Sequence, residues 1–227
     1  SLFYKYFEKP VERFYILGSP NNLVEYWNLY SATAKGVEAE IRKSLSFISP
    51  ASKWLRNMVF SANVTYLEGG IKYLVTKSPI TQKDTSYIDN GSRPIQGLSH
   101  YIINGGLNYQ DKLWGFNVAY NRFGRRIVNG GTNSRIIQYE NSRDVIDMQL
   151  SLQVLKQKAG IRFNIADLLN QPTIIYSNNV NQSPQGGYPL ELDNNDPKGS
   201  SFNKELDFVT YKVKKGTSFS ISINYKL

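Results

Sequence analysis

The chain has 227 residues, no cysteine and a single histidine, His100. Without thiols it has neither disulfides nor thiolate chemistry. One histidine is too few for a His-based metal site or a paired catalytic site within these residues. We interpret His100 as a polar residue near the outer end of a strand. The composition predicts a protein that is not an enzyme and needs no metal or cofactor in this segment.

Long apolar runs are also missing. No stretch approaches 18 consecutive apolar residues, so no transmembrane helix is predicted. Hydrophobic residues make up 41% of the chain, yet aromatic residues alone make up 13%, with 16 Tyr against 11 Phe. An aromatic ring with a polar tip suits a surface that is half apolar and half wet.

Acidic residues are fewer than basic ones: the chain has 18 Asp and Glu and 27 Lys and Arg, which gives a net charge of +9. The basic residues are scattered, with no run longer than Lys214-Lys215 or Arg125-Arg126. We therefore interpret them as solvated or lumenal groups. No aromatic-basic cluster in the sequence predicts a nucleic-acid partner.

Alternation of apolar and polar residues is the strongest pattern present. Phe219, Ile221, Ile223, Tyr225 and Leu227 alternate with polar residues, which indicates an extended strand with two unlike faces. The pattern recurs along the chain and predicts eight strands. They are the opening stretch and residues 28–43, 56–67, 97–110, 113–122, 144–156, 159–166 and 219–227. Helices are not predicted, because apolar residues at every second position cannot form one stripe along a helix. The short helix-like stretch 165–170 is interpreted as a turn at the end of a strand.

The predicted connections alternate in length. Residues 111–112 and 156–158 form very short links and 44–55 a moderate one. Long connections, rich in Asn, Gly, Ser, Pro and Asp, cover residues 8–27, 68–96, 123–143 and 167–208. Tight turns at one rim and long loops at the other are typical of an outer-membrane β-barrel. A β-sandwich is the competing fold, but its strands are usually only about 5–6 residues long.

The alternating positions of each strand, which we call its apolar and its polar parity, predict two surfaces. Tyr101 and Tyr109 lie on the apolar parity, roughly 20 Å apart along a barrel axis, as two aromatic girdles around an apolar band would require. The lipid-facing and girdle candidates are Tyr66, Tyr101, Tyr109, Trp114, Tyr120, Leu150, Phe163 and Tyr225. The lumen-facing candidates are Glu38, Glu40, Arg42, Asn104, Asn117, Asp147 and Arg162.

The polar parity carries mainly small side chains. These would leave voids in a closed eight-stranded barrel, which indicates that the strands belong to a larger barrel with a wet or plugged interior. Glu38 and Glu40 are two residues apart and have no acid-base partner in the sequence. Beside Arg42, they are interpreted as a lumenal charge ladder rather than as a catalytic pair.

Several stretches together resemble the C-terminal barrel of TonB-dependent receptors from Bacteroidota. The longest of them is residues 93–109, RPIQGLSHYIINGGLNY. The others are Phe3-Tyr4-Lys5, 10–12 (PVE), 34–40 (AKGVEAE), 120–127 (YNRFGRRI), 167–171 (DLLNQ) and 216–219 (GTSF). Their order and spacing cover nearly the whole chain.

The resemblance implies a 22-stranded antiparallel transmembrane β-barrel around a plug, of which residues 1–227 would be the last eight strands. It implies energised uptake of a siderophore, peptide or glycan nutrient across the bacterial outer membrane. The implied partners are outer-membrane lipid and lipopolysaccharide, the TonB complex acting through a plug outside this sequence, and a surface lipoprotein.

Two features depart from the family pattern. The chain ends in Leu227 where members commonly end in Phe, and it lacks the Asp-Pro-Glu signature of the glycan-importing branch, which puts a lid lipoprotein in doubt. Two other functions stay open. One is a structural or secretion-associated outer-membrane barrel without transport, and the other is a soluble all-β binding module.

Overall fold

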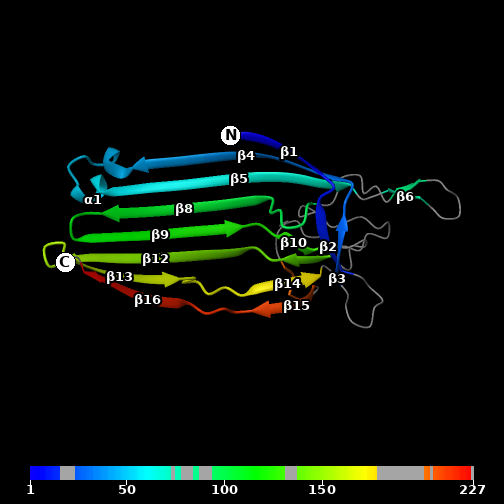
Figure 1. Ribbon diagram of the computed structural model, residues 1–227. Coiled ribbons are helices and arrows are strands. Elements are labelled where there is room, and N and C mark those ends of the chain that lie inside the picture. Colours follow the sequence, from blue (N-terminus) through cyan, green and yellow to red (C-terminus); the bar gives the residue numbers. More distant parts are fainter. Residues whose placement is uncertain are drawn as a thin grey trace.

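In the computed structural model, the main element is an eight-stranded antiparallel sheet in the strand order β1-β4-β5-β8-β9-β12-β13-β16 (Figure 1). The structure describes residues 1–15, 24–72, 75–77, 84–86, 94–130, 137–177, 202–204 and 207–225. The eight strands are β1 (Leu2–Glu8), β4 (Ser31–Ser44), β5 (Met58–Lys72), β8 (Tyr101–Gln110), β9 (Trp114–Phe123), β12 (Arg143–Val154), β13 (Ala159–Ala166) and β16 (Ser218–Tyr225). All eight predicted strands are thereby confirmed, with shifted boundaries.

Each strand of this sheet pairs with its neighbours along the order, and the sheet is open, with β1 and β16 at its two edges. Its registers run without interruption, from Leu2 opposite Val37 at one edge to Ala159 opposite Tyr225 at the other. A regular alternation of side chains fixes such a register, because a slip of one residue would turn every side chain to the other face.

The register divides the sheet into two surfaces. The row Tyr109, Phe116, Leu150, Phe163 and Ile221 runs across five strands on one side, which we call the apolar face. On the opposite side, the polar face, a parallel row consists of Asn108, Asn117, Gln149, Asn164 and Ser220.

Further strands, which the sequence did not predict, lie in or beside the long connections. They are β2 (Val11–Tyr15), β3 (Val24–Asn28), β6 (Val75–Lys77), β7 (Asp84–Ser86), β10 (Arg126–Asn129), β11 (Gln138–Glu140), β14 (Thr173–Ser177) and β15 (Phe208–Val213). The strands β10, β11, β14 and β15 form a second sheet, which continues β9, β12, β13 and β16 beyond a short break. We call this second sheet the rim sheet. The prediction of loops without strands was wrong here, because these strands are only three to six residues long and too short to show a clear alternation.

The break between the two sheets is partly built from backbone in left-handed conformations. After β13, Asp167 and Asn170 have φ values of 52° and 47°. Such values are uncommon outside glycine, and Asn and Asp tolerate them best. The turn is held by Arg143, which donates to Asp167 across 3.0 Å. The expectation that residues 165–170 form a turn at a strand end is confirmed.

The hairpin of β2 and β3 bends away from β1 and β4 and crosses the ends of the neighbouring strands (Figure 1). Lys9, with φ of 47°, and Pro10 make the bend. The hairpin reaches the rim sheet, where Gly130 donates its backbone N–H to the carbonyl of Arg13 across 2.8 Å. Phe14 is buried in a small cluster there; its other members are Leu29, Ala32 and Ile71.

The opposite end of the sheet carries the short connections, and we call it the short-turn end. Between β4 and β5 lie a 3-10 turn, η1 (Leu45–Phe47), and one helical turn, α1 (Lys53–Arg56). The helical turn α1 was not predicted from the sequence. The indole of Trp54 stacks on Tyr109 of the apolar face, with ring centroids 4.5 Å apart, and thereby holds α1 against the sheet.

Among the described residues, most of the few buried hydrophobic side chains lie in two small clusters near the ends of the strands. The cluster in the rim sheet contains Ile127, Ile137, Tyr139 and Tyr176. Most of the apolar face is uncovered, and on β16 Ile221 and Ile223 are 67% and 74% exposed. Within the described part of the chain, no helix has the length and apolar character needed to cross a membrane. Leu227 lies outside the described residues.

Candidate functional site

The polar face gathers all seven residues that the sequence placed toward a lumen. They are Glu38, Glu40 and Arg42 on β4, Asn104 on β8, Asn117 on β9, Asp147 on β12 and Arg162 on β13. The register puts them on one side, since Glu40 is opposite Asn63, which is opposite Asn104 in turn. Whether this side meets water inside a barrel stays a prediction.

Hydrogen bonds join the polar side chains between strands. Asn63 donates to Glu38 across 2.7 Å, and Asn121 donates to Asn104 across 2.6 Å. Further along the sheet, Gln149 donates to Asn164, which donates to Ser220. Such a surface can offer donors and acceptors to a polar ligand or to a folded protein segment. Among the described residues, no group of His, Cys, Asp or Glu could hold a metal ion.

The eight candidates for lipid-facing and girdle positions also share one side, the apolar face. They are Tyr66 on β5, Tyr101 and Tyr109 on β8, Trp114 and Tyr120 on β9, Leu150 on β12, Phe163 on β13 and Tyr225 on β16. Tyr66 lies opposite Tyr101 at the end toward the long connections. Trp114 and Tyr225 lie at the short-turn end. Contact with lipid itself stays a prediction.

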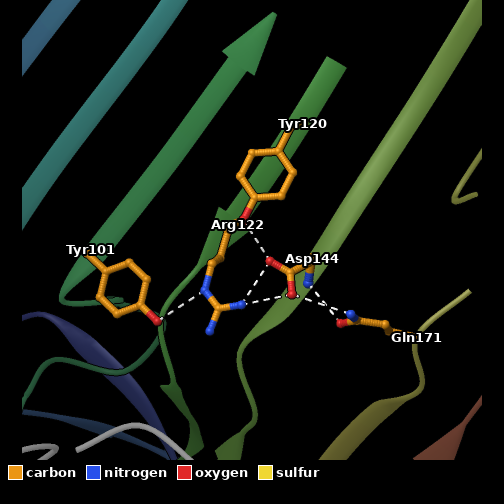
Figure 2. Close-up of polar contacts among 5 residues, drawn as sticks. All are labelled: Tyr101, Tyr120, Arg122, Asp144 and Gln171. Carbon is orange, nitrogen blue, oxygen red and sulfur yellow. Dashed lines mark hydrogen bonds and ion pairs between the residues drawn. The ribbon is translucent and has the colours of Figure 1, made fainter. Parts of the chain in front are cut away.

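A polar cluster lies where the apolar face ends, on the side toward the rim sheet (Figure 2). Arg122 on β9 donates to both carboxylate oxygens of Asp144 on β12, each across 2.8 Å. The hydroxyl of Tyr120 donates to the same carboxylate across 2.7 Å, and Arg122 approaches the Tyr101 hydroxyl at 3.4 Å. Gln171 exchanges two hydrogen bonds with Asp144. The two tyrosine hydroxyls therefore have charged partners, as amphipathic rings at an apolar-polar boundary require.

The sequence pattern indicated the two tyrosines of this cluster, whereas Arg122 and Asp144 were not predicted. A signal was present, because both residues occupy the apolar parity where the alternation ends, just beyond Tyr120 on β9 and just before Ile146 on β12. A charged residue on the apolar parity marks the edge of the band. Their pairing depends on the β9–β12 register, which places Arg122 opposite Asp144.

A second polar network fastens the β2–β3 hairpin to the rim sheet. Gln96 donates its backbone N–H to the buried Glu12 and accepts one from the backbone of Arg13, each across 2.8 Å. The Gln96 amide also donates to the carbonyl of Val128. The Arg13 guanidinium donates to the Asn129 side chain. These contacts hold the hairpin across the end of the sheet, beside the long connections.

His100, the only histidine, immediately precedes β8, and its Nδ1 lies 3.0 Å from the carbonyl oxygen of Leu67. The interpretation of His100 as a polar residue at a strand end is confirmed.

An aromatic ring also lies over a glycine near this end of the sheet. An added Cβ at Gly124 would lie 2.9 Å from the Tyr101 ring, so the glycine leaves room for the girdle tyrosine.

The short turn between β8 and β9 is organised by one carboxylate. Asp111 accepts the backbone N–H groups of Trp114 and Leu113, each across 2.8 Å, and the Tyr109 hydroxyl. The backbone donors, Trp114 first, lower the pKa of Asp111 below its ordinary value. Asp111 is therefore a charged acceptor that sets the geometry of the turn.

Long antiparallel strands with one aromatic-rimmed apolar face and one amide-rich face define a segment of a β-barrel wall. The solved structure of the ferric citrate transporter FecA in its unliganded form aligns over 85% of this chain, with 14% identity and a TM-score of 0.52. That of the siderophore receptor PiuA from Acinetobacter baumannii aligns over 99%, with 13% identity and a TM-score of 0.54.

The aligned chain covers 24% of the FecA structure and 25% of the PiuA structure, so it spans about a quarter of their length. At these identities the likeness shows the fold, which is a partial antiparallel β-barrel whose sheet is open. No protein-family model and no curated protein matches the chain. The predicted β-barrel fold class is confirmed.

Proposed function

We propose that residues 1–227 form the C-terminal part of the barrel wall of a TonB-dependent receptor in a bacterial outer membrane. The observation that carries the proposal is the eight-stranded sheet with its two unlike faces. Large exposed apolar surfaces are rare on soluble monomers, and here the apolar face runs across the whole sheet. This surface disfavours the soluble binding module. The fold shared with a transporter and a siderophore receptor supports the transport class.

In this proposal the apolar face meets lipid and the polar face lines the lumen. The barrel takes up a small nutrient, and the connections 68–96, 123–143 and 167–208 would contribute to its capture outside the cell. Energy would come from the TonB complex acting through a plug that is not in this sequence. The wall performs no bond-making chemistry and needs no cofactor. Lipopolysaccharide surrounds the outer leaflet, and a surface lipoprotein partner is the finer hypothesis left from the resemblance to Bacteroidota receptors.

Adjacent cysteine substitutions test the orientation of the wall. The chain has no cysteine, so Asn117→Cys and Val118→Cys on β9 would each add one thiol to it. In the whole protein in outer membranes, we expect a water-soluble maleimide to label the cysteine at 117 and a lipid-soluble maleimide to label that at 118. Equal labelling of both by the water-soluble reagent would contradict the membrane wall.

Uptake is tested separately from orientation. Cells that depend on this protein for a nutrient should accumulate it only while the proton motive force and the TonB complex are intact. Uptake that persists without either would favour a passive pore. Correct labelling of residues 117 and 118 without any energised uptake would favour the structural or secretion-associated barrel.

A further inference from the structure

The cations of the short turns, distant in sequence, meet at one end of the sheet. The connections 44–57, 111–113 and 155–158 all lie at the short-turn end (Figure 1). Together with the end of β4 they carry six exposed cations and one carboxylate, Asp111. The cations are Lys43, Lys53, Arg56, Lys112, Lys156 and Lys158. We call these six residues, together with Phe47, Ile48 and Trp54, the short-turn collar.

The charge of the collar is not balanced locally. No Asp or Glu occurs between Glu40 and Glu68, although this stretch contains three of the collar cations. The Lys53 ammonium lies 4.0 Å from Oδ2 of Asp111, which also accepts the Tyr109 hydroxyl, so this one carboxylate faces six cations. Within the described part of the chain, Lys43 and Arg56 have no carboxylate within ion-pair distance.

Exposed apolar side chains accompany these cations. Phe47, Ile48 and Trp54 are 63%, 60% and 59% exposed. Phe47 and Ile48 lie at the end of η1 and Trp54 lies on α1, all between Lys43 and Arg56 in the sequence. The ammonium of Lys43 lies 5.8 Å from the centre of the Phe47 ring. Because Trp54 stacks on Tyr109, this connection continues the apolar face rather than extending freely into solvent.

Aromatic rings beside lysine and arginine are the side chains that settle at the boundary between acyl chains and headgroups. Such cations are attracted to anionic phosphate groups at a membrane surface. The collar meets both requirements at one level of the sheet. A water-facing end without a ligand would need neither the uncovered rings nor the excess of positive charge.

We propose that the short-turn collar binds the phosphate headgroups of anionic phospholipids in the leaflet next to the short turns. This inference rests on the membrane placement proposed above. In that placement the short turns face the periplasm, so phospholipid rather than lipopolysaccharide is the source of the phosphate. The collar then fixes the depth of the barrel, with Trp54 in the headgroup region and its neighbouring cations on phosphates.

The test uses the whole protein, purified in detergent and given equal amounts of phosphatidylglycerol and phosphatidylcholine. Native mass spectrometry measures the ratio of the two lipids that stay bound. We expect phosphatidylglycerol to be preferred and the variant Lys43→Gln/Lys53→Gln/Arg56→Gln to lower the ratio at least tenfold. Arg56→Gln alone should lower it about fivefold, since one cation near an anionic surface contributes on the order of that factor.

A matched control removes three lysines from the other end of the strands. Lys212, Lys214 and Lys215 are exposed on β15 and in the link to β16, so changing all three to Gln removes the same charge. We expect this control to change the lipid ratio less than twofold. An unchanged ratio in the collar variant, or an equal loss in the control, would overturn the collar as a specific site.

Failure of the fold and failure of the collar are distinguishable. Protease protection of the same proteins in vesicles reports whether the barrel has inserted. A protein that does not insert removes the proposed function and the collar together. An inserted wild-type protein without preference for phosphatidylglycerol removes the collar alone. If the triple variant misfolds, the salt dependence of lipid binding by the wild-type protein is the test. The amount of bound phosphatidylglycerol should fall steeply with added salt, because salt screens exposed charges. Retention that does not depend on salt would refute the proposal.

Discussion

The substitution Leu150→Arg measures whether the apolar face meets lipid. On β12, Leu150 is the third of five apolar-face residues between Ile146 and Val154, and it is 45% exposed. Four residues on either side, at ~3.3 Å each and a tilt of ~40°, put it roughly 10 Å from both ends of this row. It therefore lies near the middle of an apolar band of ~25 Å, where an arginine costs about 2–4 kcal/mol.

The adjacent position supplies the control. Gln149 lies on the polar face between Asn117 and Asn164, so Gln149→Arg introduces the same charge on the same strand toward the other side. We expect this variant to change the free energy of unfolding by less than about 0.5 kcal/mol, as surface substitutions usually do. Reversible urea unfolding of the whole protein in phospholipid vesicles measures both values. Equal costs for the two variants, or a tolerated Leu150→Arg, would refute the assignment of the faces.

Three further predictions concern single contacts. Gly36→Ala should destabilise the sheet by about 1–3 kcal/mol in a urea titration, because its Cβ would lie 2.5 Å from a backbone oxygen, whereas Gly105→Ala should change little since its nearest neighbour is 3.8 Å away. A double-mutant cycle of Arg122→Ala with Asp144→Ala should give a coupling of about 1 kcal/mol, and a value near zero would contradict a stabilising ion pair. The lowered pKa of Asp111 stabilises its turn above the ordinary value of 3.8, and this contribution is lost as the pH falls through the lower folded value. Thermal melts of Asp111→Asn should therefore lose less stability between pH 5 and pH 2 than the wild type, and parallel curves would refute this role.

The sequence predicted the main sheet because its side chains follow a period of two over long stretches. Each predicted strand was found, and the parities sorted the polar and apolar candidates, such as Asn117 and Leu150, onto opposite faces. Strand identity and face depend only on local pattern, which one sequence displays. The rim sheet could not be predicted, because β10 and β11 have four and three residues and gain their stability from partners far along the chain.

Contacts that depend on register were also beyond the sequence. Arg122 and Asp144 are 22 positions apart, and only the pairing of β9 with β12 shows that they meet. The basic residues looked scattered for the same reason. Lys53, Lys112 and Lys158 belong to three separate connections, and the up-and-down order of the strands brings those connections to one end.

The strand order also bears on how the wall can assemble. Each strand of the main sheet pairs with the preceding and following strands of that sheet along the chain, so the sheet is a succession of hairpins. Short-range pairs such as Val154 with Ala159 keep the contact order low in the hairpins that have short turns, and local contacts form fastest. A growing wall could therefore add one hairpin at a time, with the last formed strand always serving as the template for the next.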